Sequence, residues 1–76
     1  MFSNNDLALE LEKSLVGGFN VNKISKVAFD IYQEHGLELT PPMDRALLVL
    51  MAMEEGKEFE LNEAELLELI SEIRAM

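Results

Sequence analysis

The 76-residue sequence contains no cysteine, a single histidine and only six basic residues. Without cysteine the chain forms no disulfide and has neither a thiol nucleophile nor a thiolate metal ligand. One histidine, His35, cannot build an ordinary zinc site by itself. We therefore expect no metal centre. We interpret His35 as a residue of a helical last turn, where a protonated imidazole interacts favourably with the helix dipole.

Long apolar runs are also missing. The longest covers residues 46–53, far short of the roughly 20 residues that a membrane-spanning helix needs. Residues 1–6 lack the cationic start of a signal peptide. From these absences we expect no membrane segment and a cytoplasmic location.

The sequence contains no catalytic motif. There is no Gly-x-Ser-x-Gly, and Gly17-Gly18 stands without the other glycines of a phosphate-binding loop. The acidic residues 54–65 miss the ligand spacing of a calcium loop. General acid catalysis needs a carboxyl group in a shaped, desolvated pocket, for which so small a domain has little room. We expect no enzyme activity and no cofactor.

Basic residues are scarce relative to acidic ones. Six basic against fifteen acidic residues give a net charge of −9. Residues 1–40 hold three lysines against six acidic residues, a charge of −3, whereas residues 41–76 hold three basic against nine acidic residues, a charge of −6. Binding to a nucleic-acid backbone depends on cationic side chains that release counterions. A nucleic-acid partner is therefore not expected.

The length supports one domain over residues 1–76, because half of this chain could not build a core of its own. Ser3 followed by Asp6 predicts the start of a first helix, which Gly17-Gly18 ends. In this helix Leu7, Leu11 and Leu15 repeat every four residues and share one face. Asn20 or Asn22 predicts the start of a second helix.

Gly36 predicts the end of that second helix in a Schellman motif, in which Leu37 would supply the hydrophobic contact. Thr40 followed by two prolines begins a third helix. Residues 46–53 are apolar on every side of that helix, which predicts burial on every side and a central position.

Residues 57–61 alternate polar and apolar, and without a partner strand they predict an extended connector whose Phe59 and Leu61 fill the core. Asn62 and Glu65 have the spacing of a capping box and begin a fourth helix. The predicted fold is all-α: a small bundle of four short helices around a central hydrophobic third helix.

One stretch resembles a known family. Residues 50–55, Leu-Met-Ala-Met-Glu-Glu, precede an acidic segment and a fourth helix, and this arrangement is similar to the second half of an acyl carrier protein. The resemblance implies an attachment serine at the start of the third helix, but Met43 stands there, between Pro42 and Asp44. The resemblance therefore implies a carrier-like fold that lacks its attachment serine.

Two features exceed what folding requires. Glutamates in the last third of the chain form a like-charge ridge, which costs a few tenths of a kcal/mol for each pair. On the predicted second helix, Phe29 lies off the apolar side and Tyr32 lies at the border of that side. A solvated face would account for the glutamates, and ordinary core packing would account for the aromatic residues. For either feature the alternative is a docking surface. The candidate partner-binding residues are Phe29, Tyr32, Glu58, Phe59, Glu60, Glu65, Glu68 and Glu72.

The sequence thus favours a non-catalytic, acidic protein-binding module. Its concrete version is an inhibitor or immunity-type partner of a basic protein such as a nuclease. The alternatives are the carrier-like fold without its serine and a structural homodimer closed over the third helix.

Overall fold

The computed structural model describes residues 1–76, and it contains helices but no strand. The α-helices are α1 (Asn4–Lys13), α2 (Val21–His35), α3 (Pro41–Met51) and α4 (Glu63–Arg74). Three short 3₁₀ turns lie between them: η1 (Gly36–Glu38), η2 (Ala52–Glu55) and η3 (Lys57–Phe59). The predicted all-α class with four short helices is confirmed. None of these helices combines the length and the apolarity needed to cross a membrane.

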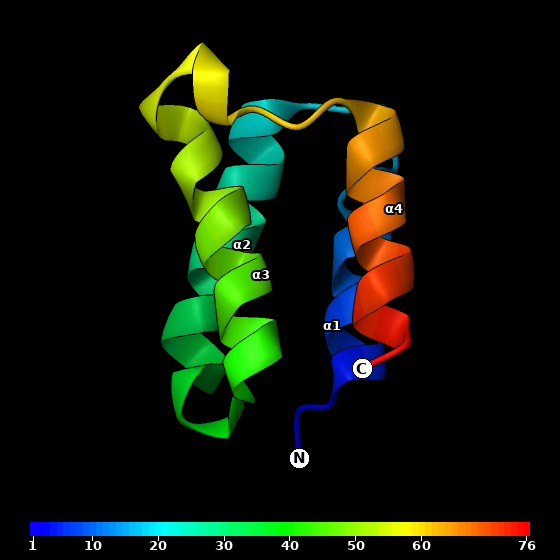
Figure 1. Cartoon of the computed structure of the whole chain (residues 1–76), viewed down its shortest axis with the longest axis vertical. Coiled ribbons are helices and arrows are strands. Elements are labelled where there is room, and N and C mark those ends of the chain that lie inside the picture. The colour runs from blue at the N-terminus through cyan, green and yellow to red at the C-terminus, as the bar shows by residue number, and fades with distance from the viewer.

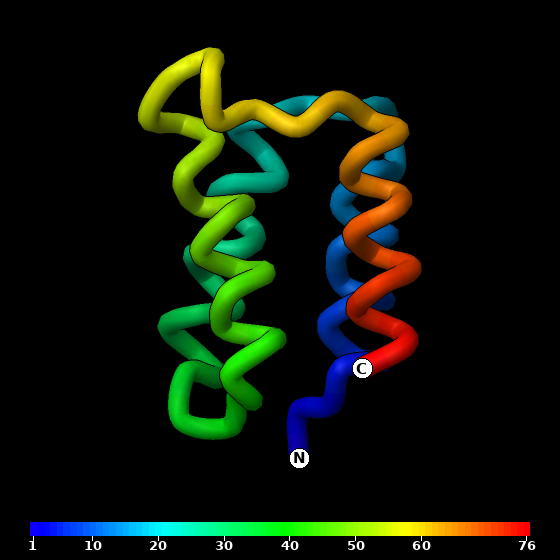
Figure 2. Tube along the Cα trace, viewed as in Figure 1, coloured from blue at the N-terminus to red at the C-terminus, as the bar shows by residue number.

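The helices pack mainly as two pairs, α2 with α3 and α1 with α4 (Figure 1). Both segments that cross from one pair to the other, residues 14–20 and 60–62, lie at the same end of the molecule, which we call the crossover end (Figure 2). The two chain termini lie at the opposite end, the open end. Helices from the two extremes of the sequence therefore lie side by side, and the Asn4 side chain donates to the Ile73 carbonyl at 3.0 Å.

The helix starts follow the local signals of the sequence. At α1 and α4 the capping boxes are complete, because the cap side chain accepts from the third helical N–H while that residue's carboxylate accepts from the cap N–H. After α1, Gly17 and Gly18 adopt φ of +92° and +116°, a region that favours glycine. The predicted N-caps are confirmed at Ser3, Asn20, Thr40 and Asn62.

The end of α2 differs from the prediction. Gly36 has φ of −52° and ψ of −35°, a right-handed conformation, so the chain tightens into η1 instead of forming a Schellman motif. Leu37 is fully exposed and makes no hydrophobic contact of the predicted kind. Leu39, two residues further, packs against the core instead.

One hydrophobic core draws on all four helices and on η2. Apolar residues on one side of α1, α2 and α4 supply much of it, because residues three and four apart share a helix face. Its buried members are Leu7, Ala8, Leu11, Ile24, Ala28, Ile31, Met43, Ala46, Leu47, Leu50, Met53, Leu66, Ile70 and Ile73.

The prediction that residues 46–53 are buried on every side is wrong for two of them. Leu48 and Val49 are 45% and 46% exposed. Leu47 and Leu50, on the opposite side of α3, are 0% exposed. The reason is the pairing of the helices, which covers one side of α3 and leaves its outer side to solvent.

The connector after α3 also differs from the prediction. Residues 57–59 form the 3₁₀ turn η3, and Phe59 is 50% exposed, so it does not fill the core. Met53, 1% exposed, occupies the core at this end and accepts a hydrogen bond on its sulfur from the Leu61 N–H at 3.4 Å. Leu61 packs against the core as predicted.

Candidate functional site

Ion pairs divide the acidic residues into two groups by position in the chain. Every acidic side chain within ion-pair distance of a basic one belongs to residues 1–40: Glu10, Glu12, Asp30, Glu34 and Glu38. Arg74 reaches back from α4 to Glu12 of α1 in a bidentate contact of 2.8 and 2.5 Å. Arg45 and Lys57 form no ion pair. None of the nine acidic residues after residue 40 therefore forms an ion pair.

The groups with shifted pKa values are three carboxylates of residues 1–40 and Arg74. The hydrogen bond from Arg74 lowers the pKa of Glu12 below its ordinary value and raises that of Arg74. Hydrogen bonds from His35, and then from the Phe2 N–H, lower the pKa of Glu38. The Ser3 N–H lowers the pKa of Asp6.

Unpaired acids line the outer side of α4. Glu65, Glu68 and Glu72 are exposed, and their spacings of three and four residues place them along one side of the helix. We call these three residues the acidic ridge. The Glu65 carboxylate accepts from the Asn62 N–H at 2.9 Å and thereby caps the helix. Glu68 and Glu72 have no hydrogen-bond or ion-pair partner in the chain.

A second unpaired acidic group surrounds an aromatic ring at the crossover end. Phe59 is 50% exposed at the end of η3, between the exposed Glu58 and Glu60. This turn projects beyond the end of α3 before the chain crosses to α4 (Figure 1). Glu54 and Glu55 of the preceding turn η2 are exposed as well. We call residues 54–60 the acidic turn.

The two aromatic residues predicted on α2 lie apart from each other. Phe29, 46% exposed, lies in a shallow hollow with Glu54 and the polar residues Asn22, Ser25 and Lys26. Tyr32 is partly buried against the core and lines a different hollow, with residues 33–38. The predicted partner-binding residues therefore fall into the acidic ridge, the acidic turn with Phe29 beside it, and a separate Tyr32.

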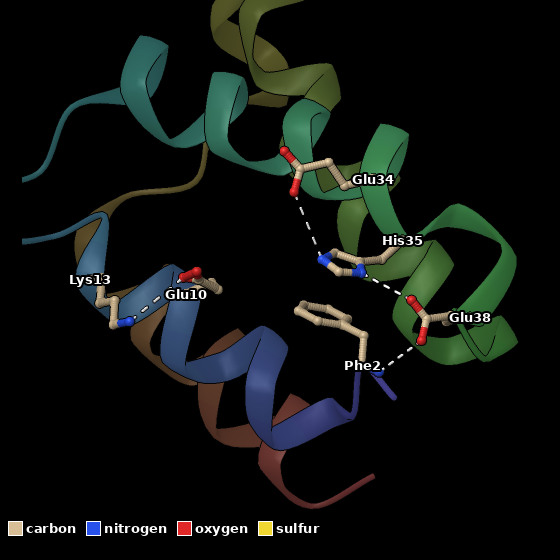
Figure 3. Close-up of polar contacts among 6 residues, drawn as sticks. All are labelled: Phe2, Glu10, Lys13, Glu34, His35 and Glu38. Atoms are coloured by element: carbon tan, nitrogen blue, oxygen red, sulfur yellow. Dashed lines mark hydrogen bonds and ion pairs between the residues drawn. The ribbon is translucent and has the colours of Figure 1, made fainter.

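Sequence reasoning did not find the contacts of the N-terminal segment, which Figure 3 shows. The Phe2 ring stacks on His35 with centroids 4.1 Å apart and planes 9° apart. His35 Nδ1 lies 3.0 Å from Glu38 Oε2, and the Phe2 N–H donates to Glu38 Oε1 at 3.0 Å. The spacing of His35 and Glu38 was a usable local signal, but Phe2 meets them only through the fold. His35 is the last residue of α2, as predicted.

The position implied by the carrier resemblance is part of the core. Met43 is 2% exposed at the start of α3. That position therefore offers neither a hydroxyl group nor a side chain that faces solvent. Nowhere does the structure gather three or more histidine or acidic side chains that could hold a metal ion. Comparisons with protein-family models, with curated proteins and with solved structures found no match to this chain.

Proposed function

We propose that the chain is a non-catalytic binding module for a basic protein. The observation that carries this proposal is the segregation of charge: the acidic ridge and the acidic turn hold carboxylates that no basic side chain of the chain neutralises. Such a surface accelerates association with a partner of opposite charge. It also rejects partners of like charge.

Phe59 supplies the apolar part of the surface. A half-exposed aromatic ring flanked by charged residues has the composition of an interface centre with a polar rim. The partner that fits carries an apolar pocket bordered by lysine or arginine. An inhibitor or immunity-type role toward a basic, cytoplasmic protein such as a nuclease follows from this chemistry.

Two observations favour a different chain over a second copy as the partner. Two copies would bring two charges of −9 together. The accessible surface of the chain, 4791 Å², is close to the value of about 4,700 Å² that folded monomers of this mass show. The exposed Leu48 and Val49 favour the alternative, a homodimer closed over the outer side of α3. Sedimentation at several concentrations separates the two, since the main proposal expects a monomer.

The test compares two triple variants that change the net charge equally. The variant E65Q/E68Q/E72Q removes the unpaired ridge, whereas E10Q/D30N/E34Q removes acids that already have partners. Partner capture is compared at low and at high salt. We expect capture by the wild type to fall with salt, and the ridge variant to lose more of it than the control variant.

A second pair of variants tests the anchor. Phe59→Ala should lower capture at least tenfold, the scale of an aromatic interface centre. Leu37→Ala removes a fully exposed side chain from η1, at the open end, and should leave capture unchanged. A partner that is captured equally by both charge variants, or independently of salt, would contradict the proposal.

A further inference from the structure

The open end of the molecule has no covalent connection between the two helix pairs. Both crossing segments lie at the other end, so the pairs are joined like the two arms of a hairpin (Figure 2). The N-terminal residues lie between the arms at the open end (Figure 1). From the start of α1, Phe2 contacts both the end of α2 and η1. We call Phe2, His35 and Glu38 the N-terminal clasp.

Carboxylates lie near both nitrogens of the His35 ring. Nδ1 lies 3.0 Å from Glu38 Oε2, and Nε2 lies 3.9 Å from Glu34 Oε2. Both ring nitrogens thus face carboxylates. An ionised carboxylate accepts hydrogen bonds and donates none. A neutral imidazole donates from one nitrogen, whereas an imidazolium donates from both.

Other charged groups lie near His35 as well. Glu34 and Glu38 belong to the end of α2 and to η1, and Asp6 of α1 interacts electrostatically with His35. The Met1 amino group is the one cation among them, and it interacts with both Asp6 and Glu38. Glu10, farther along α1, is paired with Lys13 at 4.0 Å (Figure 3). Three carboxylates and one amine therefore lie around the ring.

We propose that the N-terminal clasp is a pH-sensitive strap: protonated His35 holds Met1 and Phe2 across the open end, and loss of that proton releases them. Protonation makes the bond to Glu38 charge-assisted and therefore stronger. The strap also forms one wall of an open cavity of about 460 Å³, lined by Met1 and Phe2 together with Pro42, Met43 and Met76. Release of the strap removes that wall and uncovers Met43, which is 2% exposed.

The clasp requires two opposite protonation states, which defines its pH range. Glu38 must be ionised, and its pKa is lowered by His35 and the Phe2 N–H, so this condition fails only in acid. Histidine side chains lose their charge between about pH 5 and 8. The strap therefore loosens in acid, where Glu38 gains a proton, and again where the His35 ring loses its charge.

The chain has one histidine, so the titration of this ring can be followed without ambiguity. The experiment uses nuclear magnetic resonance on the full chain between pH 5 and 8.5, reading the His35 ring shifts and the heteronuclear NOE of the Phe2 amide. We expect this NOE to fall as the His35 ring loses its proton. The amides of Leu7 and Leu11 in α1 should remain rigid, which shows that the helix itself is unchanged.

His35→Phe provides the matched variant, because it keeps a flat ring for the Phe2 stack and removes the titration. In this variant the Phe2 amide should show no transition, and Glu38→Gln should leave it mobile at every pH. The proposal is overturned if the wild-type NOE stays constant across the range. It is also overturned if His35→Phe shows the wild-type transition, since the Met1 amine would then be the titrating group.

Discussion

Leu48 and Leu50 lie two residues apart on α3 but on different sides of it. Leu50 is 0% exposed and belongs to the core, whereas Leu48 is 45% exposed on the outer side. Replacing each with alanine removes the same atoms from the same helix. The difference in the free energy of unfolding between the two variants therefore measures how far one side of α3 is open to solvent.

The magnitudes follow from burial. Leu→Ala at a fully buried site costs about 2–5 kcal/mol, because a cavity is added to the lost transfer energy. For Leu48, roughly half of the side chain is already in water and no closed cavity forms, so the cost is about 1 kcal/mol. A domain of this size has a total stability of about 4–11 kcal/mol. Leu50→Ala thus removes a substantial fraction of it.

Urea unfolding followed by the helical circular dichroism signal gives both free energies. For a domain of 60–100 residues, 1 kcal/mol corresponds to a shift of about 4–8 °C in Tm. We therefore expect Tm to fall by about 4–8 °C for Leu48→Ala and by about two to five times as much for Leu50→Ala. Equal losses would refute the reasoning, because the outer side of α3 would then have to be covered. A loss that grows with protein concentration would identify that cover as a second copy.

Two further predictions concern the helix starts and acid. Asn62→Ala removes the acceptor of the α4 capping box and should lower the free energy of unfolding by about 1 kcal/mol in the same urea assay, and unchanged stability would contradict the capping role. The lowered pKa values of Asp6, Glu12 and Glu38 mean that their stabilisation is complete above the unfolded values of about 4 and is lost as pH falls through the folded ones. Thermal melts should therefore show Tm falling below pH 4, and the triple variant D6N/E12Q/E38Q should show a smaller fall.

The helix starts were predictable because their signals are local. Asn62 and Glu65 are three residues apart, and each satisfies the other's backbone N–H wherever the helix lies in the fold. The same holds for Ser3 and Asp6. Such pairs need no information about the rest of the chain, which is why sequence and structure agree on both.

The exposed side of α3 was not predictable, for a physical reason. Residues 46–53 are all apolar, and a run without polar members has no periodicity that shows which side faces solvent. The side is chosen by the docking of α2 and α4, which is a property of the whole fold. The end of α2 failed for a related reason, because Leu39 and not Leu37 reaches the core.

The candidate site was predictable in composition but not in pairing. The excess of acid after residue 40 can be counted in the sequence. Which acids remain unpaired depends on contacts such as that of Arg74 with Glu12, which are 62 residues apart. By drawing Arg74 toward α1, the fold removes from α4 the cation nearest to the acidic ridge. The clasp between Phe2 and Glu38, 36 residues apart, depends on tertiary structure in the same way.

The position of the charges on α4 separates folding from binding. Glu63 and Glu65 lie in the first turn, where the helix dipole favours carboxylates, so folding accounts for them. Glu72 lies near the other end, where the dipole disfavours a negative charge, and Glu68 repels it across one turn. A helix shaped only for stability would carry lysine at position 72, where it would suit the dipole and pair with Glu68. The unfavourable placement of these two glutamates, on a surface that the chain leaves unpaired, is therefore the strongest support in this molecule for a partner that supplies the missing positive charge.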